Sequence, residues 1–219
     1  MQKTKLSCID CALNNCEHRG ETHPTFCPTN NFKLEEHAQL IERLEDEQNK
    51  RIIDSAAFSA HVGHRQKLSH LEETVVFAQR YGAQKIGIAA CISLAAEARA
   101  AAKVFRAQGF EVVGAICKAG CITFGDLNVP EDERGPDAVL CNPLYQAQLL
   151  NEEKTDLNVV IGLCTGHDAL FLKYADAPCT VLTAKDFKFD HCSIRALREG
   201  DPSSDYEHLV SQKVHWEHA

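Results

Sequence analysis

Residues 85–117 read KIGIAACISLAAEARAAAKVFRAQGFEVVGAIC, and their pattern predicts the fold class. KIGIAA is a short apolar segment of strand length, and SLAAEARAAAKVFRAQ has the length and alanine content of a helix. Gly109 stands where it can end that helix, and EVVGAIC then has the pattern of a second buried strand. A strand, a helix and a strand in this order predict two parallel strands joined by a right-handed crossover.

The same alternation continues towards the carboxyl terminus. NPLYQAQLLNEEK predicts a helix with Pro143 in its first turn, and NVVIGLC predicts a strand. GHDALFLKYAD and PCTVLTA then predict a last helix and a last strand, whereas residues 118–140, rich in glycine and proline, predict a long loop. We therefore expect an α/β protein with a layered parallel sheet of about four strands and flanking helices.

The segment before the sheet is expected to be helical. Leu34, Ile41 and Leu44 recur at helical spacing, with glutamates between them. Two further helical stretches follow, and the last ends near Gly82, which suits the position after a helix. Residues 1–31 differ, because they are polar, turn-rich and too poor in apolar residues for a core of their own.

These differences in composition and residue pattern predict two domains. The first is a small cysteine-rich, metal-held module at residues 1–31. The second is an α/β domain at residues 32–219, with a helical lead-in over 32–81 and the strand–helix repeat over 85–190.

Composition argues against several classes of function. The 219 residues carry a net charge of −8 without a basic block, which disfavours nucleic-acid binding. The longest apolar run, near Ile86–Ala96, is too short to span a bilayer, and MQKTKLSC lacks the apolar core of a signal peptide. We expect a cytoplasmic protein that binds neither nucleic acid nor membrane.

Eleven cysteines are many for such a protein, and four of them lie near the amino terminus. A reducing cytosol disfavours disulfides, so this abundance indicates metal or redox chemistry. The spacing Cys8-x2-Cys11-x4-Cys16-x10-Cys27 is typical of ligands, since two thiolates three residues apart can bind one metal centre. Uneven spacing and Pro28 after the last cysteine favour a [4Fe–4S] cluster, with zinc as the alternative.

Four further cysteines follow predicted strands or precede a predicted helix. Cys91, Cys117 and Cys164 stand at strand ends, and Cys141 directly precedes the helix that begins at Asn142-Pro143. Because ligands bind beyond the carboxyl ends of parallel strands, these four thiols are expected to form a second, cofactor-binding site. Three cysteines lie elsewhere: Cys179 and Cys192 are interpreted as structural or incidental, and Cys121, in the long loop, as an optional participant.

Polar neighbours of these thiols are candidates for catalytic roles. Thr165 and Asp168 have the spacing of a capping box, which would place Cys164 just ahead of a helix amino terminus, where thiolate is favoured. Lys118 can add positive charge, and His167 can act as a ligand or proton carrier. Lys118 is equally compatible with a solvated loop position, and the simpler interpretation of His167 is an ordinary residue of the first helical turn.

Gly162-Leu163-Cys164-Thr165-Gly166 also matches a nucleophile elbow, G-x-C-x-G, between a strand and a helix. This pattern would make Cys164 the nucleophile of a thiol hydrolase. The histidine that such an enzyme needs is hard to place, because His191 follows Asp186 by five residues. The hydrolase interpretation also leaves the cysteines at the other strand ends unexplained.

Several longer motifs resemble a known family. They are CIDCALNNC and FCPT near the start, CK at 117–118, CNPLYQAQLLN at 141–151 and GLCTGHDALFLKYADAPCTVLTAKD at 162–186. Together they resemble an uncharacterised bacterial and archaeal domain of unknown function, whose members are described as predicted metal-binding proteins. The resemblance implies a cysteine-bound metal in the amino-terminal module and thiols at the four strand-end positions, but it implies no reaction.

The leading hypothesis is therefore an iron–sulfur redox protein with one or two [4Fe–4S] clusters. Its partner would be an unidentified redox protein or a small molecule, and both catalysis and oligomeric state stay open. Two alternatives remain, which are a zinc-stabilised carrier of metal or sulfur without turnover and the thiol hydrolase.

Overall fold

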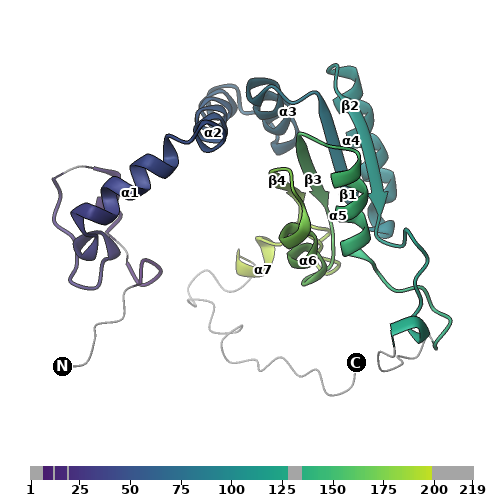
Figure 1. The fold of residues 1–219 in the computed structure, drawn as a ribbon. Helices are drawn as coiled ribbons and strands as arrows, with labels where there is room; N and C mark the ends of the chain where they lie inside the picture. Colours follow the sequence, from purple (N-terminus) through teal and green to yellow (C-terminus); the bar gives the residue numbers. More distant parts are fainter. Residues whose placement is uncertain (1–6, 12, 19, 128–134, 199–219) are drawn as a thin grey trace. The chain divides into compact units, whose positions relative to one another are not determined.

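The computed structural model describes residues 7–11, 13–18, 20–127 and 135–198 (Figure 1). The chain forms two compact units, Met1–Ala56 and Ala57–Ala219, and each is described by itself. No helix in the described part of the chain is long and apolar enough to cross a membrane.

The second unit contains the predicted parallel sheet. Its strands are β1 (Lys85–Ala90), β2 (Glu111–Ile116), β3 (Leu157–Ile161) and β4 (Cys179–Thr183), and all neighbouring pairs are parallel. Their spatial order is β2-β1-β3-β4. The α/β fold predicted from the strand–helix alternation is confirmed, including the number of strands.

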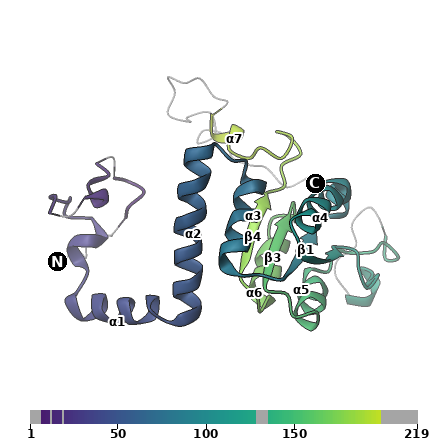
Figure 2. The ribbon, with the colours of Figure 1, turned by 90° about the horizontal axis from the view of Figure 1, so that it is seen from above.

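Helices cover both faces of this sheet. Figure 2 shows α3 (His70–Tyr81) and α4 (Ala95–Ala107) on one face, and α5 (Pro143–Glu152) and α6 (His167–Tyr174) on the other. The chain moves from β1 outwards to β2 and then returns past β1 to β3, so the direction of winding reverses between β1 and β3. In open α/β sheets, ligands bind beyond the carboxyl ends of the strands at such a reversal.

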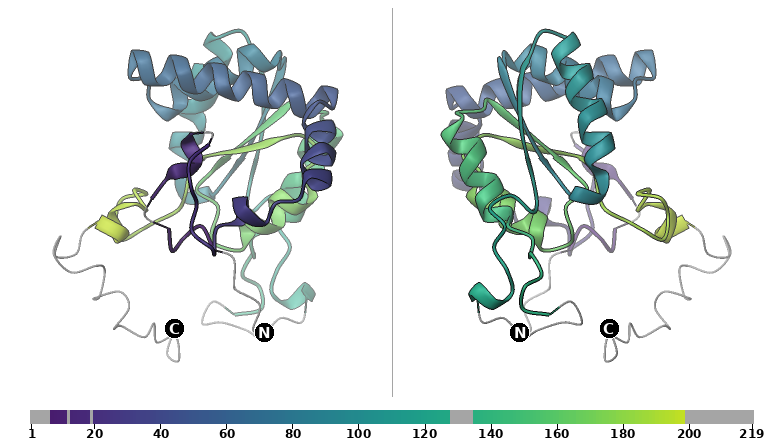
Figure 3. Two further views of the ribbon diagram at one scale, coloured as in Figure 1. Left: turned by 90° about the vertical axis from the view of Figure 1, so that its left-hand side faces the viewer. Right: turned by 90° about the vertical axis from the view of Figure 1, so that its right-hand side faces the viewer.

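The core lies between the two helical layers. Every residue of β3 is buried, and so are Ile86 and Ile88 of β1, because both strands lie inside the sheet. Phe105 from α4 and Phe171 from α6 are fully buried on its two sides. Figure 3 shows the twisted strands between these helices. Apolar burial of this kind is the main stabilising contribution and fixes where each strand ends.

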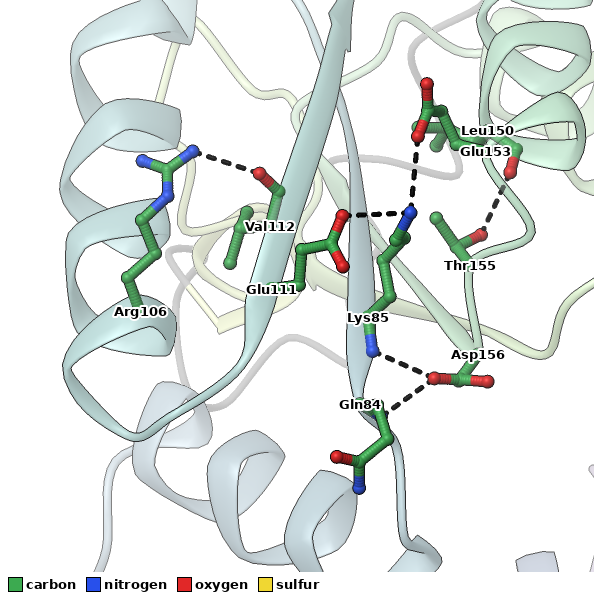
Figure 4. Close-up of polar contacts among 9 residues, drawn as sticks. All are labelled: Gln84, Lys85, Arg106, Glu111, Val112, Leu150, Glu153, Thr155 and Asp156. Atoms are coloured by element: carbon green, nitrogen blue, oxygen red, sulfur yellow. Dashed lines mark hydrogen bonds and ion pairs between the residues drawn. The ribbon is translucent and has the colours of Figure 1, made fainter.

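Polar contacts align the strands at their amino-terminal edge (Figure 4). The Asp156 carboxylate accepts hydrogen bonds from the backbone N–H groups of Gln84 and Lys85, at 2.7 and 2.8 Å. The Lys85 ammonium lies 2.9 Å from Glu111 and 3.3 Å from Glu153. These contacts join the starts of β1, β2 and β3, so their ends also come level at the opposite edge.

The remaining elements are two helices before α3 and several short helices. The helices α1 (Leu34–Leu44) and α2 (Glu47–Gln66) confirm the predicted helical segment, and α2 crosses the boundary between the two units. Leu34, on the apolar face of α1, is 82% exposed. The short helices are η1 (Asn15–Glu17), η2 (Pro28–Asn31), η3 (Ile92–Leu94), η4 (Gly125–Leu127) and α7 (Arg195–Arg198).

Candidate functional site

The structure brings Cys91, Cys117, Cys141 and Cys164 to the carboxyl edge of the sheet. Cys91 and Cys117 directly follow β1 and β2, and Cys164 follows β3 by three residues. The Asn142 N–H donates a 2.7 Å hydrogen bond to the carbonyl of Cys117, which places the start of α5 beside the end of β2. Four segments that are distant in the sequence thus each contribute one thiol to the same edge.

These thiols form two pairs. The Sγ atoms of Cys117 and Cys141 lie 3.8 Å apart. Cys91 and Cys164 share a lysine, because the Nζ atom of Lys185 lies 2.6 Å from Cys91 Sγ and 3.2 Å from Cys164 Sγ. Cys91 and Cys117 are buried, whereas Cys141 and Cys164 are partly exposed. All four are free cysteines and can therefore act as ligands or nucleophiles.

The two buried thiols have opposite electrostatic environments. Burial raises the pKa of Cys91, but hydrogen bonds from Lys185 and Ser93 outweigh it and bring this pKa down to about 7. Burial raises the pKa of Cys117 to about 12, and the neighbouring thiols Cys141 and Cys91 add to the rise. Near neutral pH the edge therefore holds one thiol ready to ionise beside one that stays protonated.

Lys185 responds to the same contacts. Burial disfavours its charge, but the hydrogen bonds to Cys91 and Cys164 outweigh this cost and raise the pKa of the ammonium. Lys185 lies two residues beyond the end of β4, so the rule that placed the cysteines at this edge applies to it as well. Sequence reasoning missed Lys185 because it considered only cysteines and their immediate neighbours.

The two polar candidates from the sequence have different surroundings. The Lys118 ammonium donates a hydrogen bond to the carbonyl of Val139, which joins the two ends of the long loop. Burial lowers the pKa of His167, and the charges of Lys185 and Lys118 lower it further, so the imidazole is neutral near pH 7. A neutral imidazole is the form that can bind a metal or accept a proton.

The capping box predicted for α6 is wrong. The helix begins at His167 with Gly166 as its N-cap, so Thr165 lies outside it. The Asp168 carboxylate instead accepts hydrogen bonds from the N–H groups of Gly166 and Ala169, at 2.9 and 2.8 Å. The reason is the left-handed backbone of Gly166, with φ 87°, which turns the chain one residue later than the capping pattern requires.

Cys164 nevertheless stays close to the helix start, because its carbonyl accepts hydrogen bonds from the N–H groups of His167 and Asp168. Among the described residues, the hydrogen-bond partner of its thiol is Lys185 and not a histidine. The Nδ1 atom of His191 accepts a hydrogen bond from the backbone N–H of Asp186. The catalytic pair expected of a thiol hydrolase is therefore not assembled around Cys164 in this part of the chain.

A second residue that sequence reasoning missed is Gln146, which is fully buried in α5. Its Nε2 atom donates to the carbonyls of Ala90, at 3.1 Å, and Ala115, at 2.7 Å, which lie near the ends of β1 and β2. Gln146 therefore joins the helix that follows Cys141 to the two strands that precede Cys91 and Cys117. A glutamine on the buried face of a helix was the available signal.

Replacing Gln146 with leucine is expected to lower the free energy of unfolding by about 1–3 kcal/mol, because two buried hydrogen bonds are lost, each contributing about 0.5–1.5 kcal/mol. Chemical denaturation measures this change. The matched control is Gln148→Leu, since Gln148 lies exposed on the same helix and contacts Glu152. A surface change of this kind is worth within about 0.5 kcal/mol. Equal losses in both variants would contradict the bridging role of Gln146.

The four amino-terminal cysteines lie in the segment before α1, where backbone hydrogen bonds bring two parts of the chain together. The Cys11 N–H donates to the carbonyl of Cys8 at 3.2 Å, and the Ser7 N–H donates to the carbonyl of Phe26 at 3.4 Å. These hydrogen bonds place the first two cysteines near the segment that contains Cys27, which is buried. A hydrogen bond from Thr29 lowers the pKa of Cys27. Cys8 and Cys16 are exposed.

Neither cysteine set is closed around a single point. Within residues 7–127 and 135–198, apart from positions 12 and 19, no three His, Cys, Asp or Glu side chains gather closely enough to hold one metal ion. The described thiols therefore lie in pairs at the sheet edge and in a turn near the amino terminus, and they do not form a preformed tetrahedral site.

Comparison with known proteins confirms the predicted resemblance to a family of unknown function. Residues 27–182 match the family model described as "Protein of unknown function (DUF1847)". The chain is also 37% identical, over 159 residues, to the "Uncharacterized protein MJ0455" of Methanocaldococcus jannaschii. That alignment covers 73% of this chain and 81% of the relative. The matched family region includes all four thiols of the sheet edge and ends before Lys185.

Proposed function

The chain belongs to the DUF1847 family of proteins of unknown function, so any evidence for its activity must come from its own residues. From these residues, we propose that it is an iron–sulfur redox protein. In this proposal, the sheet-edge thiols bind a [4Fe–4S] cluster. The observation that carries it is the convergence of four thiols from four separate segments at the edge where the winding of the sheet reverses. The four ligands would be Cys91, Cys117, Cys141 and Cys164.

The donor set suits a cluster. Four thiols are the common ligand set of a [4Fe–4S] cluster, in which each thiolate binds a different iron. The ligands of a cluster therefore stand farther apart than those around one zinc ion. Cys117 and Cys141, with Sγ atoms 3.8 Å apart, stand at about the spacing of two thiolates on one zinc ion, so these two thiols would have to move apart to bind a cluster.

The residues around the thiols supply what such a group needs. The Ile92 N–H donates to Cys117 Sγ at 3.4 Å, and Ser93 Oγ lies 3.2 Å from Cys91 Sγ. Hydrogen bonds to the ligand sulfurs orient them and tune the reduction potential. Because Cys117 is protonated near neutral pH, it must release its proton when it becomes a ligand. A bound cluster would supply one-electron transfer.

We extend the proposal to the amino-terminal module, where Cys8, Cys11, Cys16 and Cys27 would hold a second [4Fe–4S] cluster. The turn that joins Cys8 to Cys11 and the burial of Cys27 support a bound centre in this loop. Thiolates also suit zinc, which is therefore the alternative for this module.

Metal and sulfide analysis of anaerobically purified protein tests the proposal. We expect a brown protein with about eight irons and eight sulfides per chain, the sum of two four-iron clusters. The double variant Cys117→Ser/Cys141→Ser should retain about four of each. The control Cys179→Ser, which changes the thiol at the start of β4 and therefore at the opposite edge of the sheet, should keep the wild-type content. Wild-type iron in the first variant would contradict a cluster at the sheet edge.

A carrier of sulfur or soft metal is the second candidate. It is favoured by the Lys185–Cys91 contact of 2.6 Å, because a thiolate is the form that takes up a soft metal or sulfur. A colourless protein with about one zinc, and with metal or sulfur bound at Cys91, would support the carrier and exclude electron transfer.

A further inference from the structure

Lys185 has an unusual set of neighbours for a lysine. Its Nζ atom lies 2.6 Å from Cys91 Sγ and 3.2 Å from Cys164 Sγ. It also lies 5.1 Å from the centre of the Phe187 ring, whose face attracts a cation. The ammonium is thus held between two sulfurs and an aromatic ring, and it is partly buried.

Within the part of the chain that the structure describes, the Lys185 ammonium forms no ion pair with a carboxylate. Other lysines do form such pairs, since Lys50 lies beside Glu45, and Lys85 lies beside Glu111 and Glu153. The neighbouring Asp186 carboxylate accepts hydrogen bonds from the backbone of Lys188 and Phe189 instead. The positive charge of Lys185 is therefore directed at the two sulfurs.

We propose that Lys185 is the positioning and charge-compensating residue of the sheet-edge site, where it stabilises the reduced state of the group bound by the cysteines. This inference rests on the proposed iron–sulfur function. One electron supplied by a reductant such as dithionite makes the site one unit more negative. No bond breaks and no proton moves, because the ammonium already stands beside two ligand sulfurs and attracts the added charge.

The position of Lys185 explains why it can contact both thiols of the Cys91–Cys164 pair. It extends from the end of β4, whereas Cys91 and Cys164 follow β1 and β3, the strands on either side of the reversal in winding. Both contacts are far shorter than the Debye length of about 8 Å at physiological salt, so dissolved ions screen them little. A charge held there acts on the site more strongly than a charge on the surface.

Potentiometric titration of the intact, anaerobically purified protein tests this inference. Lys185→Met should lower the midpoint potential of the sheet-edge cluster by about 60 mV, which corresponds to a tenfold change in a one-electron equilibrium. Lys185→Arg should stay close to wild type, because it keeps the charge. The matched control is Lys188→Met, since Lys188 lies in the same segment but over the Phe189 ring, 5.3 Å from its centre. It should leave the potential unchanged.

Iron and sulfide content, measured on the same samples, separates the two ways of failing. A wild-type protein without a sheet-edge cluster would overturn the proposed function and this inference together. A loaded Lys185→Met variant with the wild-type potential would overturn the role of Lys185 alone. Cluster loss in Lys185→Met, with retention in Lys185→Arg and a native circular dichroism spectrum, would support the charge role. Equal effects of Lys185→Met and Lys188→Met would contradict it.

Discussion

Gly87→Ala is expected to lower the free energy of unfolding by about 3 kcal/mol, since it overfills a packed core and disturbs a buried hydrogen bond. A Cβ atom at Gly87 would lie 2.2 Å from Asn158 Oδ1 and 2.9 Å from Leu150 Cδ1. Asn158 is fully buried, and its Oδ1 atom accepts a 2.8 Å hydrogen bond from Thr155. The asparagine therefore cannot move aside without losing a partner.

The neighbouring strand provides the matched control for this prediction. Gly114 of β2 lies beside β1, but a Cβ atom there would meet nothing nearer than the carbonyl of Ile88, at 3.4 Å. Gly114→Ala should therefore change stability by less than about 1 kcal/mol. Chemical denaturation of both variants, with comparable slopes, measures the difference. Equal destabilisation by Gly87→Ala and Gly114→Ala would show that the loss comes from replacing any strand glycine and not from the close approach of Asn158 to Gly87.

This close approach also shows what periodicity can and cannot predict. The alternation of strand-length and helix-length segments predicted the parallel α/β fold, because each segment carries its own pattern of apolar residues. The alternation could not predict the spatial order of the strands, because that order depends on which faces of the sheet the crossovers cover. The contact of Gly87 with Asn158, 71 positions later, is likewise a tertiary feature without a local signal.

The candidate site likewise contains residues that local sequence patterns predicted and residues that they did not. The strand ends can be predicted from the sequence. The cysteines at positions 91, 117, 141 and 164 could therefore be assigned to one edge of the sheet from their places in the strand–helix alternation. Lys185 and Gln146 were missed because their roles depend on contacts across the sheet edge and with the backbone of other strands. The capping pattern at Thr165 failed because the left-handed Gly166 displaced the helix start. Local rules therefore placed the thiols, and only tertiary contacts revealed what surrounds them.

Those surroundings predict an unusually acidic thiol in the metal-free protein. With a pKa of about 7, Cys91 is about half ionised at pH 7, whereas an ordinary cysteine with a pKa near 8.5 is about 3% ionised. The expected enrichment in thiolate is therefore roughly fifteenfold. The pKa of Cys91 is lowered because the positive charge of Lys185 favours the deprotonated thiol. The thiolate therefore appears as pH rises through about 7, and not above 8 as for an ordinary cysteine.

Ultraviolet absorbance of the thiolate, followed against pH in the metal-free protein, measures this ionisation. A transition near pH 7 should be present in the wild type and absent from Cys91→Ser, which assigns it to that thiol. Lys185→Met should move the same transition to higher pH, since burial alone raises the pKa of Cys91. Cys117→Ser should leave it in place, because Cys117 stays protonated throughout this range. A wild-type transition that stays near pH 8.5, or one that Lys185→Met does not move, would show that the ammonium does not hold Cys91 as a thiolate.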